Sequence, residues 1–156
     1  MRALVQRVSW AEVEVDGRAV SRIEKGLLVY LGIGISDSEA QIPWLAQKIA
    51  GLRIFTDAQG KMNLSVQDVG GGVLVISNFT LMGDARKGRR PEFTSAAPAN
   101  AAQPLYEAFL NALAQTGCRC CGGVFQAHMA VRSEADGPVN IVVDSVIALD
   151  GNNAIS

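Results

Sequence analysis

Apolar and polar residues alternate from Ala3 to Val15, which is typical of a half-buried β-strand. Asp16-Gly17 follows, a pair that favours a tight turn, and the apolar positions resume up to Ile23. This pattern predicts a β-hairpin. The continuous apolar run from Leu27 to Ile33, bounded by glycines, predicts a central strand that is covered on both faces.

Two later segments have helical spacing. Apolar residues recur every three or four positions from Ile42 to Leu52, after N-cap candidates at 36–38, and Pro43 is tolerated in a first turn. This predicts a helix that ends near Gly51. A second helix is predicted from Ala101 to Ala114, with Gly117 as its C-cap.

The remaining apolar runs predict strands. Short strands at 53–55 and 62–64 flank a turn, and a buried strand spans 73–78. Two more strands, at 125–132 and 139–144, are separated by a turn rich in Ser, Glu, Asp, Gly and Pro. Strands and helices do not alternate strictly, so we expect a single α+β domain with a curved, mostly antiparallel, barrel-like sheet and two main helices. We assign this domain to residues 1–147 and a loosely ordered tail to 148–156.

Composition excludes several classes of protein. The chain has 156 residues, 49% apolar and 19% charged, with a formal net charge of −1, so it is globular and neither disordered nor strongly basic. Any contact with nucleic acid must therefore be local. No apolar run reaches the roughly 18 residues of a membrane span, and no secretory signal opens the chain, so we expect a cytoplasmic protein without membrane association. Three crowded cysteines, Cys118, Cys120 and Cys121, agree with a reducing compartment.

The segment Ser77-Asn78-Phe79-Thr80-Leu81 follows the buried strand at 73–78. Polar groups at a strand end face solvent or ligand while the strand fixes their position, so this segment is a candidate binding site. The alternative is a strand that simply ends in turn-forming residues. Thr80 would need a nearby base to act as a nucleophile, and the single histidine, His128, lies in a predicted strand with no readable partner.

Gly137-Pro138 is a second candidate, directly before the last strand. Bonds that precede proline adopt the cis form cheaply, and glycine lets the backbone approach a ligand, so rigid carbonyls at this point could act as a gate. The alternative is an ordinary turn that leads into a strand.

A basic cluster is the third candidate and comprises Arg86, Lys87, Arg89 and Arg90 around Gly88. Several cations on one loop can meet several phosphates, and their contrast with a slightly acidic chain favours an RNA contact. A solvated charged loop is the other interpretation.

The cysteines do not have the spacing of a zinc site, because no second Cys pair exists, and we predict no metal and no cofactor. A reactive thiolate at Cys120 or Cys121 stays open, although both residues follow a helix C-terminus, which does not lower a thiol pKa.

Taken together, these segments resemble the D-aminoacyl-tRNA deacylase (D-tyrosyl-tRNA deacylase) family from residue 1 to about 145. The matching stretches are 1–8, 52–55, 60–65, 79–81, 87–91 and 136–139. The resemblance implies hydrolysis of the ester bond of D-aminoacyl-tRNA. It also implies a homodimer in which Gly137-Pro138 of the partner subunit, in cis, completes each pocket.

The resemblance also implies roles for individual residues. Ser77, Asn78, Phe79 and Thr80 would receive the terminal adenosine and the ester carbonyl, and Gly137 and Pro138 would reject L side chains by collision. Arg7 would hold this gate, Met129 would contact the substrate, and the basic cluster would bind tRNA. We expect backbone N–H groups near Phe79 and Thr80 to stabilise the oxyanion, and a substrate ribose hydroxyl to help activate water, without an acyl-enzyme on Thr80.

The chain departs from the family at three points. The family usually has Gln at Asn78, Thr at Asn140, and Gly-Ala-Asp-Met-Gln at 126–130, where this chain has Gln-Ala-His-Met-Ala. Two alternatives therefore stay open: a non-catalytic tRNA-binding relative, and a thiol-dependent hydrolase that uses Cys120 or Cys121. Whether mischarged glycyl-tRNA is also a substrate stays open as well.

Overall fold

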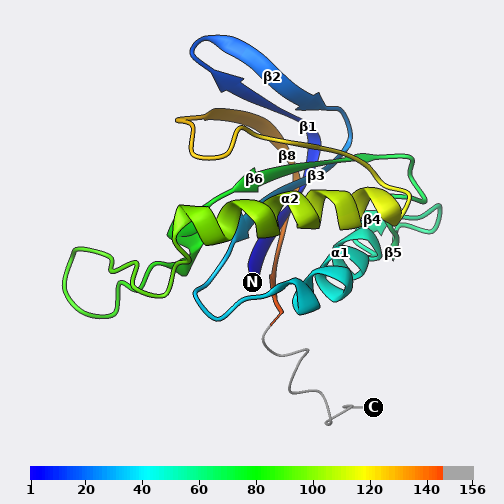
Figure 1. Ribbon diagram of the computed structural model, residues 1–156. Helices are drawn as coiled ribbons and strands as arrows, with labels where there is room; N and C mark the ends of the chain where they lie inside the picture. Colours follow the sequence, from blue (N-terminus) through cyan, green and yellow to red (C-terminus); the bar gives the residue numbers. More distant parts are fainter. Residues whose placement is uncertain (146–156) are drawn as a thin grey trace.

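A long hairpin opens the fold, as the alternation predicts. In this computed structural model, which describes residues 1–145, β1 (Arg2–Val15) turns into β2 (Arg18–Ile23) (Figure 1). Asp16 and Gly17 form the turn with φ of 50° and 75°, the conformation that a two-residue hairpin requires. Residues 146–147 of the predicted domain and the predicted tail at 148–156 lie outside the described residues.

The main sheet is built around β1. On one side β1 pairs with β2 and with β3 (Gly26–Gly32), and on the other side with β8 (Ala130–Asp144), always antiparallel. β3 continues the sheet through parallel pairing with β6 (Gly72–Ser77), which is itself parallel to β7 (Arg119–Gly122). The strands form a curved sheet that nearly closes into a barrel, which confirms the predicted single α+β domain (Figure 1).

Two helices pack against each other on one face of this sheet (Figure 1). A short 3₁₀ turn, η1 (Glu39–Gln41), leads into α1 (Ile42–Ala50), and α2 (Ala99–Gln115) ends where Gly117, at φ 91°, donates its N–H to the carbonyl of Ala114. A small antiparallel sheet of β4 (Phe55–Thr56) and β5 (Met62–Leu64) follows α1.

The core has two parts because the central strands are covered on both faces. Leu27, Val29 and Leu31 of β3 face the helices, where they pack with residues such as Leu45. Leu28 faces the opposite side, in a second cluster with residues from β1, β2 and β6. The predicted burial of both faces of this strand is therefore confirmed.

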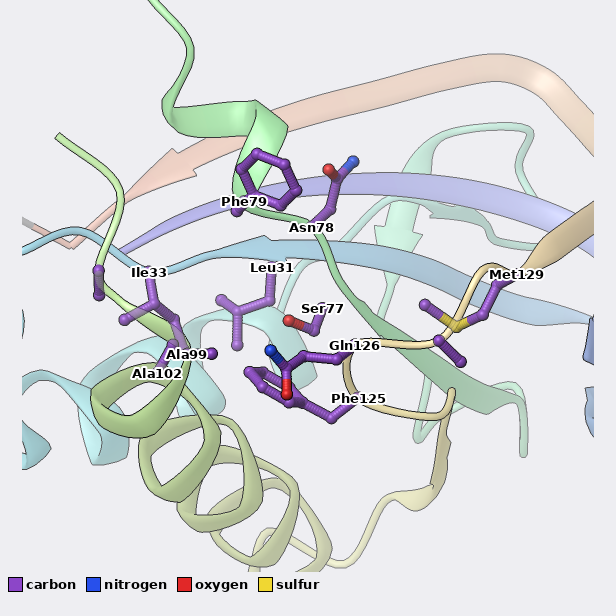
Figure 2. A pocket seen from close by; sticks show the side chains of 12 residues that line it. Leu31, Ile33, Ser77, Asn78, Phe79, Ala99, Ala102, Phe125, Gln126 and Met129 are labelled. Atoms are coloured by element: carbon purple, nitrogen blue, oxygen red, sulfur yellow. The ribbon is translucent and has the colours of Figure 1, made fainter. Parts of the chain in front are cut away.

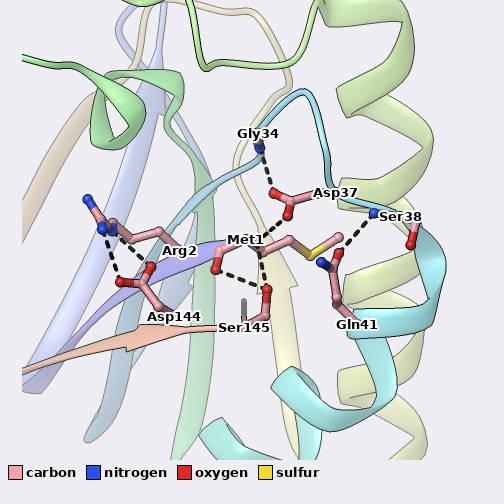
Figure 3. Close-up of polar contacts among 8 residues, drawn as sticks. All are labelled: Met1, Arg2, Gly34, Asp37, Ser38, Gln41, Asp144 and Ser145. Atoms are coloured by element: carbon pink, nitrogen blue, oxygen red, sulfur yellow. Dashed lines mark hydrogen bonds and ion pairs between the residues drawn. The ribbon is translucent and has the colours of Figure 1, made fainter. Parts of the chain in front are cut away.

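The N-terminus is part of the packed structure. The α-ammonium group of Met1 lies 2.6 Å from the Asp37 carboxylate and donates to the hydroxyl of Ser145, also at 2.6 Å (Figure 3). The second oxygen of Asp37 accepts from the N–H of Gly34 at 2.6 Å, and the side chain of Asp37 is only 2% exposed. The neighbouring ion pair between Arg2 and Asp144 is much more open to solvent.

The strands differ from the prediction at four points. β7 was not predicted, and β8 is one continuous strand where two strands with an intervening turn were expected, because β1 is long enough to pair with it on both sides of Gly137. Register shifts in this pairing, between Gln6 and Val8 and between Val8 and Trp10, accommodate the irregular segment. His128 lies in the loop before β8, and the strand predicted at 53–55 begins only at Phe55.

Candidate active site

A cavity of about 490 Å³ lies at the carboxyl ends of β3 and β6 (Figure 2). These strands are parallel, with Leu31 opposite Ser77, so their carboxyl ends meet at one edge of the sheet, where ligands commonly bind in such sheets. The lining residues are Leu31, Ile33, Ser77, Asn78, Phe79, Ala97, Ala99, Ala102, Phe125, Gln126, Ala127 and Met129. The cavity is thus mostly apolar, with a few polar groups at defined positions.

Ser77 and Phe79 offer hydrogen-bonding groups at this cavity. Neither the Ser77 hydroxyl nor the Phe79 N–H has a hydrogen-bond partner among residues 1–145. The side chain of Phe79 is 57% exposed beside the cavity (Figure 2). A donor and a hydroxyl are therefore available to a ligand in this space.

Asn78 has a local structural role. Its side-chain oxygen accepts from the N–H of Thr80 at 3.1 Å and from the Thr80 hydroxyl, and thereby caps the 3₁₀ turn η2 (Phe79–Met82). The Thr80 N–H, one of the expected oxyanion donors, is engaged by this contact, which leaves the Phe79 N–H as the available one. Thr80 itself does not line the cavity.

Tyr106 of α2 holds the segment that closes the cavity on the side of Phe125. Its hydroxyl donates to the carbonyl of Val75 at 2.9 Å, and the N–H of Gly123 donates to the same carbonyl, also at 2.9 Å. The ring of Tyr106 packs on Phe125 with centroids 5.8 Å apart. Burial raises the pKa of Tyr106 to about 12, so the phenol stays a donor at neutral pH.

Arg7 fixes the backbone just before Gly137. Its Nε donates to the carbonyl of Asp136 at 3.0 Å and lies 3.1 Å from the Asp136 carboxylate, while Nη1 donates to the carbonyl of Ile54 at 2.5 Å. The Gly137-Pro138 bond is cis, and both residues are exposed. Gly137 has φ 134°, and a Cβ there would lie 2.8 Å from the Val139 N, so only glycine fits.

Within one chain, Arg7, Gly137 and Pro138 lie apart from the cavity. Arg7 pairs with Leu27 and Ser77 pairs with Leu31, so Arg7 and Ser77 are two strands and four residues from each other. Strand spacing and rise put them on the order of 15 Å apart. Gly137 and Pro138 do not line the cavity of their own chain, whereas Met129 does.

The basic cluster lies on the loop between η2 and α2 (Figure 1), and residues at both ends of this loop, Phe79 and Ala97, line the cavity. Asp84 and Glu92 pair at its base, and the ring of Phe93 contacts that of Phe79 with centroids 5.1 Å apart. Arg86 forms an ion pair with Asp84 at 2.5 Å, and its hydrogen bonds lower the pKa of Asp84 to about 2. Lys87, Arg89 and Arg90 are exposed and form no ion pair with residues 1–145.

The cysteines and the histidine lie outside the cavity lining. Burial raises the pKa of the thiols of Cys120 and Cys121, which reduces the thiolate fraction that a thiol-dependent hydrolase needs. Within residues 1–145, no group of three or more His, Cys, Asp and Glu side chains is placed to hold a metal ion. No helix in this part of the chain is long and apolar enough to span a membrane.

The sequence did not predict Phe125 and Gln126 as site residues. They were assigned to the start of the strand predicted at 125–132, whereas the structure places them in a turn whose residues line the cavity. Gly122-Gly123, which Val124 separates from Phe125, was the available signal, since paired glycines mark a break in a strand.

Comparisons with known proteins agree on one family. Residues 4–144 match the profile of the family described as D-Tyr-tRNA(Tyr) deacylase. Two curated proteins named D-aminoacyl-tRNA deacylase, from Thermotoga petrophila and Koribacter versatilis, are 53% and 57% identical over 145 residues, which cover 93% of this chain and 97% of each relative.

Two solved structures have the same fold. One, named c-Myc DNA Unwinding Element Binding Protein, aligns with a TM-score of 0.87 and 38% identity over 92% of this chain and 98% of that chain. The other, a probable eukaryotic D-amino acid tRNA deacylase, has a TM-score of 0.76 at 17% identity and covers 91% of this chain and 97% of its own.

Proposed function

The chain belongs to the D-Tyr-tRNA(Tyr) deacylase family, and we propose that it hydrolyses the ester bond between a D-amino acid and the ribose of tRNA. The observation that supports this proposal most strongly is the high identity to named D-aminoacyl-tRNA deacylases over 93% of the chain. A cavity with an unengaged hydroxyl at Ser77 and an unengaged N–H at Phe79 is consistent with it. The volume is in the range of small-molecule sites.

The reaction needs little from the side chains. Water attacks the ester carbonyl, the oxyanion of the tetrahedral intermediate accepts from the Phe79 N–H, and the bond to the ribose oxygen then breaks. The leaving oxygen takes up a proton, which gives a free D-amino acid and tRNA. The neighbouring ribose hydroxyl is placed by the substrate itself to help activate the water. In this scheme Asn78 and Thr80 keep the η2 turn in shape and no acyl-enzyme forms.

Selection against L-amino acids is assigned to Gly137 and Pro138 of a partner subunit in a homodimer. Carbonyl groups set against the α-carbon collide with an L side chain, whereas a D side chain points away from them. The separation of these residues from the cavity of their own chain supports delivery by a second copy. Two exposed apolar residues, Phe79 and Val142 at 57% and 60%, are of the kind that an interface covers. The structure contains one chain, so the homodimer stays a prediction.

Purified protein should release D-tyrosine from D-tyrosyl-tRNA much faster than L-tyrosine from L-tyrosyl-tRNA. Glycyl-tRNA should also be hydrolysed, because glycine has no side chain for the gate to reject. Ester loss from the three substrates, measured at equal enzyme concentration, tests this. Equal rates for the D and L substrates would disprove chiral selection, and tight tRNA binding without ester loss would identify the non-catalytic alternative.

Replacement of both Arg89 and Arg90 with alanine should weaken tRNA binding and lower the salt dependence of the affinity. Each lost phosphate contact reduces the slope of log K against log salt by about 1, so the double variant should lose about 2. Arg86→Ala is the matched control and should have less effect, because Asp84 already neutralises Arg86. Filter binding at several salt concentrations measures all three proteins. A change in the D/L ratio of the double variant would contradict this separation of roles.

A further inference from the structure

Gln126 has an unusual backbone conformation in the segment that closes the cavity. Its φ is 62°, a region that residues with a Cβ enter uncommonly and that is often retained at ligand sites. The turn is fixed on both sides, since Gly123 donates to Val75 at 2.9 Å and Ala127 donates to Val124 at 3.2 Å. The surrounding structure therefore imposes this conformation on Gln126.

The consequence of this conformation is the direction of the side chain. Figure 2 shows the amide of Gln126 extending from its turn into the cavity, in front of Phe125 and toward the start of α2 at Ala99 and Ala102. The amide makes no hydrogen bond to any of residues 1–145. Because most of the lining is apolar, this group is one of the few that can give a ligand direction.

We propose that Gln126 binds the adenine base of the substrate's terminal adenosine. This inference rests on the proposed function, which brings an aminoacyl-adenosine to the cavity. A glutamine amide donates and accepts side by side, and adenine offers a donor at N6 next to an acceptor at N7 or N1, so a two-bond pairing is possible. Phe125 beside it supplies a face on which a base can stack.

The adenine is a better partner for Gln126 than the amino acid is. The amino-acid side chain varies between substrates, and the gate acts at its α-carbon, whereas the terminal adenosine is common to all tRNAs. A turn whose backbone is held in place, and which presents one amide to the cavity, suits a constant group. The pairing makes Gln126 a specificity residue for the nucleoside.

Two non-hydrolysable ligands test this: 3′-(D-tyrosylamino)-3′-deoxyadenosine, and its counterpart with purine in place of adenine, which lacks the N6 amino group. The wild-type protein should bind the adenine ligand roughly tenfold more tightly, as one base pairing of this kind predicts. Gln126→Gly should bind the two ligands within about twofold of each other, because glycine accepts a positive φ and only the side chain is lost. Calorimetric titration measures all four affinities.

The purine ligand is an internal control. Purine keeps the acceptor at N7 or N1 and lacks only the donor at N6, so Gln126→Gly should bind this ligand only a few-fold more weakly than wild type does. Retained binding of this ligand shows that the cavity of the variant is intact, so that the lost preference belongs to the amide. If wild type does not distinguish the ligands, or if Gln126→Gly keeps the preference, the inference is overturned. Hydrolysis of D-tyrosyl-tRNA by the same wild-type preparation shows that the proposed function survives such a result, whereas failure of both ligands to bind together with no hydrolysis overturns both.

Discussion

Replacement of Arg7 with lysine should lower the preference for D- over L-tyrosyl-tRNA by about ten- to a hundredfold. Arg7 is 7% exposed and joins the backbone before Gly137 to a second segment at Ile54. Its planar group reaches three acceptors at once, which a single ammonium group does not do. Hydrogen bonds to charged groups contribute about 1.5–3 kcal/mol, and about 1.4 kcal/mol corresponds to a factor of ten, which sets the expected range.

Most of this loss should come from faster hydrolysis of the L substrate. In the proposed mechanism, a gate that is less firmly held can move away from an L side chain, so the L substrate is no longer excluded. A D side chain does not contact the gate, so its hydrolysis should change little. Single-turnover rates with both tyrosyl-tRNAs measure the ratio directly. Sedimentation of the variant at the same concentration shows whether its oligomeric state has changed, which separates a loosened gate from a lost interface.

Arg2→Lys is the matched control. Arg2 lies on the same strand and also pairs with an aspartate of β8, Asp144, but this pair is open to solvent and distant from Gly137. The D/L ratio of this variant should equal that of wild type. An unchanged ratio in Arg7→Lys would show that the gate does not depend on Arg7, and the proposed role of Arg7 would be wrong.

Asp37→Ala should lower the free energy of unfolding by about 3–5 kcal/mol, which is typical when one partner of a buried ion pair is removed. The α-ammonium group of Met1 would stay buried with the Ser145 hydroxyl but without an opposite charge, and the N–H of Gly34 would lose its acceptor. Guanidinium denaturation followed by circular dichroism measures the change.

Asp144→Ala provides the comparison from the next residue pair. Arg2 and Asp144 have side chains that are 45% and 27% exposed, and exposed pairs contribute roughly 0–1 kcal/mol. The Asp144→Ala variant should therefore unfold within about 1 kcal/mol of wild type. Similar losses in both variants would show that the Met1 site is not the buried pair described above.

Local patterns predicted the hairpin, the two helices and the buried strands because each depends on residues close in sequence. The turn at Asp16-Gly17 and the apolar spacing from Ile42 to Leu52 are examples. β7 has no such signal: it is short, contains Arg119 and Gly122, and forms only because β6 offers a parallel edge. The sequence pattern divided β8 at Gly137-Pro138. The continuity of β8 depends on the length of β1, a strand that is distant in the sequence, so local residues could not indicate it.

The candidate site could be predicted only where neighbouring residues of one segment contribute polar groups to it. Ser77 to Phe79 were predicted in this way, and they line the cavity with Met129. The apolar part of the lining comes from β3 and α2, whose residues at Ile33 and Ala102 look like ordinary core positions in the sequence. Gln126 was noted only as a departure from the family, and its positive φ could not be read from a residue type that rarely adopts it.

The buried amino group at Met1 also determines how the protein should be handled. A formyl group retained from synthesis, or an affinity tag joined to this nitrogen, would convert the ammonium into a neutral amide and leave the Asp37 carboxylate without its counter-ion. A tag fused at that end would also have to leave through the packed space between Gly34 and Ser145. Purification handles therefore belong at the opposite end of the chain.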